Sequence, residues 1–129
     1  MLDAVKDKYH LITVYGDTPS EDVNRLVCSY LPDRETRVLQ PKDEAALMQA
    51  AQNSSLVLIV VKNLSDPVVN LAKTLRQDRR VVAEILAVVL DDAQPDMFSY
   101  LKAGFDLCLS LENCQHSAFK SILRQRLAL

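Results

Sequence analysis

The sequence predicts an α/β fold with three layers, in which one five-stranded parallel sheet in the order 2-1-3-4-5 lies between two layers of helices. Short, β-rich apolar segments alternate with segments of helical periodicity, and short turns join them. Such alternation is typical of parallel strands covered on both faces. Two apolar segments, residues 56–61 and 81–90, are nearly continuous, as expected for central strands that are buried on both faces.

Length and composition fit a single globular domain over residues 1–129. The composition is 49% apolar and 25% charged, which is ordinary for such a domain. A net charge of −2 without a basic block argues against direct nucleic-acid binding. The only two glycines, Gly16 and Gly104, leave no glycine-rich phosphate loop. Whether the chain is the N-terminal part of a longer protein is left open.

The chain is expected to be cytoplasmic and not membrane-bound. No apolar run approaches the roughly 20 residues that span a bilayer, and residues 1–8 mix acids and bases without the apolar core of a signal peptide. The three cysteines, Cys28, Cys108 and Cys114, show no metal-binding or redox spacing, so buried reduced thiols are expected.

In the first half of the chain, residues 9–15 are predicted to form the first strand. A capping box over residues 18–21, with Pro19 at the first helical position, then begins a helix with an apolar stripe of Val23, Leu26, Val27, Tyr30 and Leu31. Residues 36–40 form a more polar strand near an edge of the sheet, residues 44–52 form the second helix, and residues 55–61 form the central strand.

In the second half, Asp66 or Ser65 caps a third helix whose inner stripe is Val68, Leu71, Ala72 and Leu75. Residues 82–90 form the fourth strand and residues 96–102 a short helix with Gly104 at its C′ position. Residues 105–109 form the fifth strand. The last helix is expected to be capped by Asn113, with Ser110 as a weaker candidate, and to bury Phe119, Ile122, Leu123 and Leu127. Five such βα units fit the flavodoxin-like strand order 2-1-3-4-5.

Three segments resemble the receiver domain of bacterial response regulators, which serves phosphorelays in two-component signal transduction. They are the apolar Leu56–Ile59, the pair Leu75-Arg76, and the segment Leu101–Asp106, whose Ala-Gly-Phe-Asp step is the most specific of the three. The resemblance covers nearly the whole chain and implies the same flavodoxin-like fold. It also implies a place for the chemistry, because a receiver's acceptor aspartate at the end of the third strand attacks phosphorus with the help of Mg²⁺.

The residues for that chemistry are missing. Counting back fifteen positions from Leu75 places Val60 where the acceptor aspartate belongs, and the acidic pair for Mg²⁺ falls at Tyr15 and Gly16, or one residue later. The strand-four Ser or Thr is absent from residues 85–92, and Leu111 stands at the lysine position. The sequence therefore resembles a degenerate receiver, or pseudo-receiver, that is not an enzyme and has no catalytic residue, metal or cofactor.

The remaining polar residues leave alternatives open. Asp17 and Asp91 are weak candidates for a metal site at the carboxyl edge of the sheet, with Asp92 and Lys62 near them, although solvated loop carboxylates are the favoured explanation. A phosphorylatable receiver with a relocated acid is one alternative function, and a flavodoxin-like domain that binds a small ligand or nucleotide is another. A charged turn over residues 76–80 is expected at the opposite edge.

The resemblance indicates instead a domain that acts through contact with partner proteins, independently of phosphorylation. In receivers, the face made by helix 4, strand 5 and helix 5 is the usual dimerisation and output surface. Here that face is rich in apolar residues, which favours an interaction surface and a possible homodimer. Its candidate members are Met97, Phe98, Tyr100, Leu101, Cys108 and Leu111.

Overall fold

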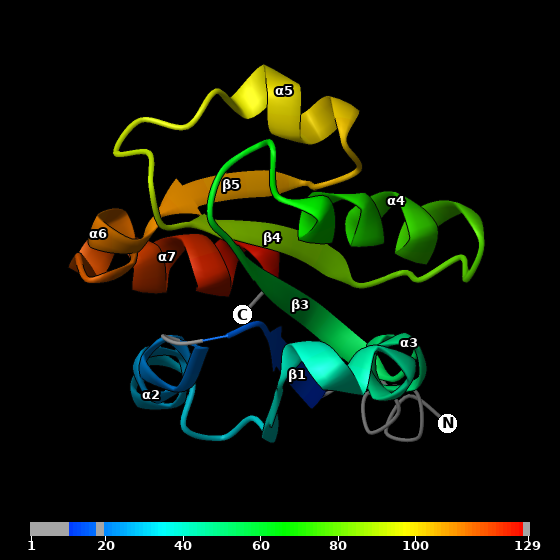
Figure 1. Ribbon diagram of the computed structural model, residues 1–129. Helices are drawn as coiled ribbons and strands as arrows, with labels where there is room; N and C mark the ends of the chain where they lie inside the picture. The colour runs from blue at the N-terminus through cyan, green and yellow to red at the C-terminus, as the bar shows by residue number, and fades with distance from the viewer. Residues whose placement is uncertain (1–10, 18–19, 128–129) are drawn as a thin grey trace.

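The computed structural model describes residues 11–17 and 20–127 and contains the predicted sheet (Figure 1). Its five strands run parallel in the order β2-β1-β3-β4-β5. They are β1 (Leu11–Tyr15), β2 (Thr36–Leu39), β3 (Ser54–Val61), β4 (Glu84–Val89) and β5 (Leu107–Ser110). The flavodoxin-like arrangement predicted from the sequence is thus confirmed, with β2 at an edge and β3 in the centre.

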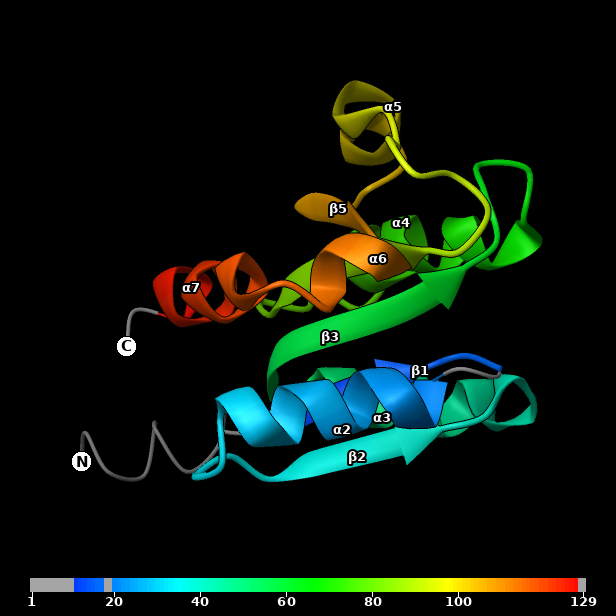
Figure 2. The same ribbon diagram turned by 90° about the vertical axis from the view of Figure 1, so that its left-hand side faces the viewer.

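Helices cover both faces of this sheet. On one side lie α2 (Ser20–Tyr30), α6 (Leu111–Cys114) and α7 (Ser117–Arg126), and these three helices face the viewer in Figure 2. On the other side lie α3 (Glu44–Ala51) and α4 (Asn70–Gln77), each preceded by a short 3₁₀ turn, η1 (Pro41–Asp43) and η2 (Pro67–Val69). The short helix α5 (Met97–Lys102) lies beyond β5 (Figure 1). None of the helices in the described residues is long and apolar enough to cross a membrane.

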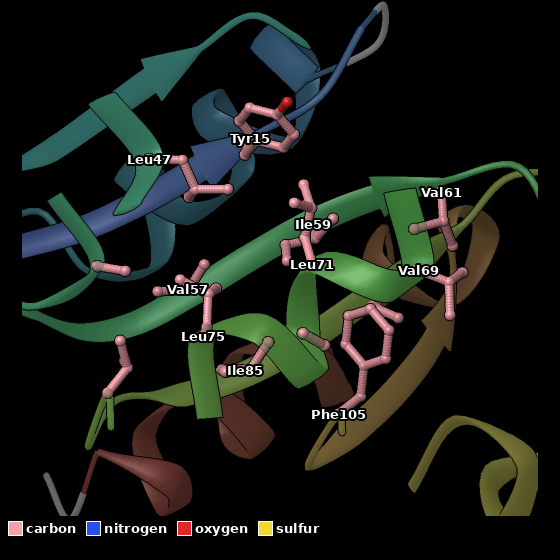
Figure 3. Packing of buried hydrophobic residues seen from close by; sticks show 14 of the residues in the cluster. Tyr15, Leu47, Val57, Ile59, Val61, Val69, Leu71, Leu75, Ile85 and Phe105 are labelled. Atoms are coloured by element: carbon pink, nitrogen blue, oxygen red, sulfur yellow. The ribbon is translucent and has the colours of Figure 1, made fainter. Parts of the chain in front are cut away.

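The sheet divides the hydrophobic core into two clusters. Alternate residues of β3 enter opposite clusters, so that Val57, Ile59 and Val61 meet α3 and α4 (Figure 3), whereas Leu56, Leu58 and Val60 meet α2 and α7. All six are buried, and full burial of a side chain of this size contributes about 1.5–3 kcal/mol. This two-sided burial explains why the β3 sequence is continuously apolar and not alternating.

A buried polar chain fastens α3 to the sheet. The Thr13 and Ser54 hydroxyls lie 2.8 Å apart, and the Ser54 Oγ also donates to the Ala50 carbonyl at 2.8 Å. Thr13 and Ser54 belong to the neighbouring strands β1 and β3, and Ala50 lies near the end of α3. Because each hydroxyl has a partner, the two buried polar groups avoid the cost of an unmade hydrogen bond.

Several predicted boundaries shift. The fourth strand begins at Glu84 and not at Val82, whose side chain is 72% exposed. The fifth begins at Leu107, because Phe105 leaves the strand to pack edge-on against Tyr100 of α5, with ring centroids 5.8 Å apart. Asp66 caps η2, as predicted, by accepting a hydrogen bond from the Val68 amide at 3.0 Å. The strand residues 9–10 and the predicted capping residues 18–19 lie outside the described residues.

The cap of the last helical region is also different from the prediction. Ser110 is the residue whose side chain caps α6, and it accepts from the backbone amide of Asn113 at 3.1 Å. Asn113 lies inside that short helix, and the chain then turns at residues 115–116 before α7 begins. The single predicted helix is thus two helices. Phe119 and Leu123 are buried on α7, as the spacing predicts.

Candidate functional site

Val60 lies at the carboxyl end of β3, where the resemblance places a nucleophile. Its side chain is only 6% exposed, and it pairs in register with Val88 of β4. The backbone of Gly16, just after β1, lies so close that a Cβ atom at Gly16 would come within 2.7 Å of the Val60 Cβ. The space in front of this strand end is therefore filled by apolar packing, and Val60 offers no oxygen that could attack phosphorus.

Tyr15 occupies the first of the two positions expected for metal-binding acids. Its side chain turns into the cluster beneath α3, and its hydroxyl donates to the Pro41 carbonyl at 2.8 Å. Burial raises the pKa of Tyr15, and the negative charges of Glu44 and Asp43 raise it further. The phenol is therefore protonated at neutral pH and acts as a structural hydrogen-bond donor. Asp17, the next acid along the chain, is exposed.

The loops after β3 and β4 use their polar side chains to hold their own backbone. Asn63 accepts from the Ser65 amide at 2.9 Å, and Asp66 accepts from the Lys62 amide at 3.0 Å. The two loops lie side by side, because the Asp91 amide donates to the Lys62 carbonyl at 2.9 Å. In the described part of the chain, no three His, Cys, Asp or Glu side chains come together so that they could hold a metal ion.

Leu111, at the position of the receiver lysine, is the first residue of α6. It is half-buried and lies across the sheet from α5, so it does not join the predicted apolar face there. Leu111 lines an open groove of about 510 Å³ between α2 and α6. The other residues that line this groove are Asp22, Arg25, Leu26, Ser29 and Gln115. Asp22 and Arg25, three positions apart on α2, pair with each other at 2.9 Å on that helix's side of the groove.

The two buried thiols are not activated. Cys28, Cys108 and Cys114 are all free; the last two are buried, whereas Cys28 is only half-buried. Burial raises the pKa of Cys114 to about 12. Burial also raises the pKa of Cys108, and the charges of Asp96 and Asp92 add to the effect. Since the thiolate is the nucleophilic form, neither buried cysteine is suited to covalent chemistry at neutral pH.

The predicted apolar face separates into buried and exposed residues. Tyr100 and Cys108 are buried and belong to the core, so they hold α5 against the sheet. Phe98 is 63% exposed, Leu101 48% and Met97 36%. We call these three side chains the α5 apolar face. Lys102 lies over the Phe98 ring, with its Nζ 4.5 Å from the ring centroid.

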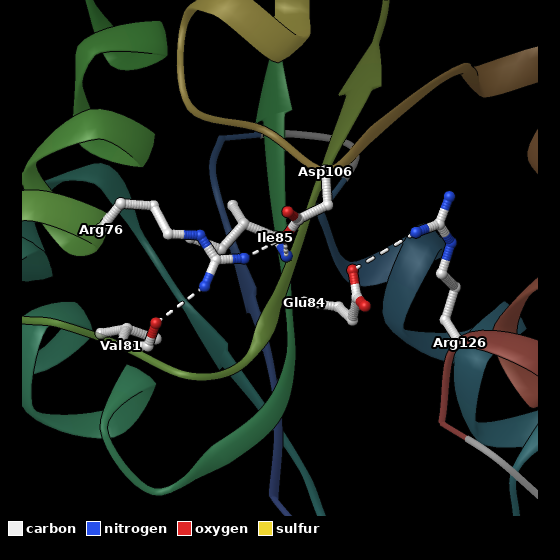
Figure 4. A network of polar contacts seen from close by, with 6 residues as sticks. All are labelled: Arg76, Val81, Glu84, Ile85, Asp106 and Arg126. Atoms are coloured by element: carbon white, nitrogen blue, oxygen red, sulfur yellow. Dashed lines mark hydrogen bonds and ion pairs between the residues drawn. The ribbon is translucent and has the colours of Figure 1, made fainter.

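At the opposite edge of the sheet, a polar network joins four charged residues from distant parts of the chain (Figure 4). Arg76 of α4 pairs with Asp106 and donates to the Val81 carbonyl at 2.7 Å, and Asp106 also accepts from the Ile85 amide at 2.8 Å. The Nη1 atom of Arg126, on α7, lies 3.6 Å from the Oε2 atom of Glu84. Arg76 is thus a structural residue and not part of a solvated turn.

Sequence reasoning missed this network, although one signal was present. Glu84 is a lone acid inside an otherwise apolar segment, and a charge in such a place generally requires a partner. Burial raises the pKa of Glu84, as does the charge of Asp106, whereas Arg126 and Arg76 oppose the rise. Arg76 and Asp106 thus hold α4 against the sheet, and the network presents no nucleophile or ligand cage.

No family model matches the chain, and a search of curated proteins gives no match either. The comparisons thus leave its family and its function open.

Proposed function

We propose that this chain is a pseudo-receiver, a receiver-like domain of a bacterial signal-transduction protein that acts in the cytoplasm by binding other proteins. One observation carries the proposal. In a receiver-like fold, the strand end that should hold the phosphoacceptor holds Val60, packed against the backbone of Gly16. Signalling through this frame must then use its surface and not a covalent step at the carboxyl edge.

The exposed surface supports such a role. Five large apolar side chains are exposed in the described residues, and three of them form the α5 apolar face. Single exposed apolar residues are normal on a protein surface, whereas grouped ones often mark a contact site. A helix of six residues that buries only Tyr100 gains little stability from this arrangement. A partner that covers the face provides a reason for it.

The proposal is tested by incubating the chain with acetyl phosphate and Mg²⁺ and measuring its intact mass. We expect no hydroxylamine-sensitive phosphoryl adduct, because no carboxylate stands at position 60. A receiver that is known to accept phosphate from the same donor serves as the positive control. An aspartyl phosphate on this chain would overturn the proposal. The variants Asp17→Ala and Asp91→Ala would then show whether a relocated acid carries the group.

A further inference from the structure

The surroundings of the α5 apolar face carry a predominance of negative charge. Asp91, Asp92 and Asp96 lie on the segment that leads from β4 into α5 and are exposed. Asp66 lies on the loop after β3. The two loops are neighbours, because the Asp91 amide donates a hydrogen bond to the Lys62 carbonyl of that loop. Four carboxylates therefore stand around α5 against three ammonium groups, those of Lys62, Lys102 and Lys73, whose backbone lies against Gly104 just after α5.

These carboxylates are close to the residues that anchor α5. Burial raises the pKa of Tyr100 to about 12, and the charges of Asp92 and Asp66 are among those that add to the rise. Asp96 and Asp92 act in the same way on Cys108, whose sulfur lies 3.9 Å from the Met97 sulfur. Asp91, Asp92 and Asp96 precede α5 in the chain, and Asp96 directly precedes Met97, so these carboxylates lie at the start of the helix that carries the α5 apolar face. We call them, with Asp66, the acidic margin of that face.

The Phe98 ring shows how a cation can be received on this surface. Lys102 already lies over the ring, at a distance where the ring's negative face attracts an ammonium group. With 63% of Phe98 exposed, the side chain remains open to a further partner. The chemistry available is thus apolar contact at the centre, and attraction of positive charge at the ring and at the margin.

A second copy of this chain fits the surface poorly. A two-fold dimer through the α5 apolar face would place the same patch on both sides of the contact. The acidic margins would then face each other, and opposed like charges disfavour association. Three exposed side chains also form a small centre compared with the roughly 800 Å² per partner of a standard stable interface.

We propose that the α5 apolar face binds an amphipathic segment of another protein that combines lysine or arginine with large apolar side chains. This inference rests on the proposed function and specifies the chemistry of its partner. Apolar residues of the segment would cover Met97, Phe98 and Leu101, and its basic residues would pair with the aspartates of the margin. Such a contact weakens as salt screens the charges.

The test uses a synthetic amphipathic peptide of leucine and lysine, and the same peptide with glutamate in place of lysine. Binding to the whole chain is measured by titration, and its location by amide chemical shifts in NMR spectra. We expect the lysine peptide to perturb α5 and the loop before it, and the glutamate peptide to bind at least about tenfold more weakly, which is about 1.4 kcal/mol.

Two variants separate the apolar and charged contributions. Phe98→Ser should weaken binding of the lysine peptide about tenfold, and the double variant Asp91→Asn with Asp92→Asn should weaken it and reduce its salt dependence. Val82→Ser is the matched control, because Val82 is 72% exposed but lies just before β4, at the opposite edge of the sheet. It should bind the peptide like the parent chain, and thermal unfolding checks that each variant is folded.

The inference is overturned if the lysine peptide perturbs other residues, if the Phe98→Ser variant binds as tightly as the parent chain, or if both peptides bind equally. A homodimer in sedimentation experiments that Phe98→Ser disrupts would also overturn it, by identifying a second copy as the occupant. None of these readouts depends on phosphorylation. Failure here is therefore distinct from failure of the proposed function, which the acetyl phosphate experiment measures.

Discussion

At Gly16 the backbone has a φ of 149°, a conformation that residues with a side chain rarely adopt. A methyl group there would also lie 2.7 Å from the Val60 Cβ, far inside normal contact. The two residues are thus fitted to each other, and the glycine leaves space for the valine. The end of β1 and the end of β3 can approach this closely only because one of them has no side chain.

Gly16→Ala is therefore expected to lower the free energy of unfolding by about 2 kcal/mol, from backbone strain and from overpacking against Val60. Urea denaturation measures the change. Gln49→Ala, at an exposed position of α3, is the control and should stay within about 0.5 kcal/mol of the parent chain. Equal stability of the Gly16→Ala variant and the parent chain would show that the strand ends can move apart without cost.

Glu84 is a residue whose charge works against the fold. Burial and the nearby Asp106 raise its pKa, and Arg126, at 3.6 Å, compensates only in part. Its Oε2 atom is buried and accepts no hydrogen bond from the described residues. The folded state therefore binds a proton here more readily than the unfolded chain does. Between the ordinary glutamate pKa of 4.5 and the raised value, stability falls as pH rises.

Glu84→Gln should remove the loss of stability that ionisation of Glu84 causes. We expect the variant to be more stable than the parent chain at pH 7, by up to about 1 kcal/mol, with the advantage disappearing as the pH falls below the raised pKa of Glu84. Denaturation at a series of pH values measures it. Arg126→Gln should have the opposite effect, because it removes a charge that stabilises the ionised carboxylate. If the free energies of unfolding of Glu84→Gln and the parent chain differ by the same amount at all pH values, ionisation of Glu84 is not the cause of the difference.

Among the elements, α6 is the one whose formation depends most on a single side chain. It has only four residues, and isolated helices this short are not stable in water. Ser110 provides the cap by accepting from the Asn113 amide, and it is itself buried at the end of β5. The strand-to-helix junction therefore positions both Leu111 and the start of α7.

Ser110→Ala should cost about 1 kcal/mol, the usual value of an N-cap side chain, whereas Asn113→Ala should change stability by less than about 0.5 kcal/mol because its side chain is exposed. Chemical denaturation of the two variants distinguishes the observed cap from the one that the sequence favours. The reverse order of effects would restore Asn113 as the capping residue.

For the whole molecule, the order of strands follows from where the apolar segments lie. The continuous runs of β3 and β4 predict central strands, and the mixed sequence of β2 predicts an edge, because burial on two faces demands two apolar faces. The start of β4 could not be predicted in this way. Val82 and Val81 read alike in the sequence, yet only Val81 turns inward.

The candidate site was predictable where it depends on which residue type is present, and unpredictable where it depends on orientation. The sequence alone shows that position 60 has no carboxylate. It does not show which residues of a six-residue helix are exposed, because so short a helix has too few turns for a clear apolar stripe. The pairing of Arg76 with Asp106 joins residues thirty positions apart, and only the fold brings them together.

The division of the core by the sheet has a consequence for how this domain can change. Leu58 and Ile59 are neighbours in sequence, but the one packs toward α2 and α7 and the other toward α3 and α4. Substitutions on opposite faces share few partners, so their effects on stability combine almost independently. The residues of each helical layer can thus change together with the core cluster that they pack against. The surface on one side of the sheet can therefore acquire a new binding partner while the packing on the other side is kept.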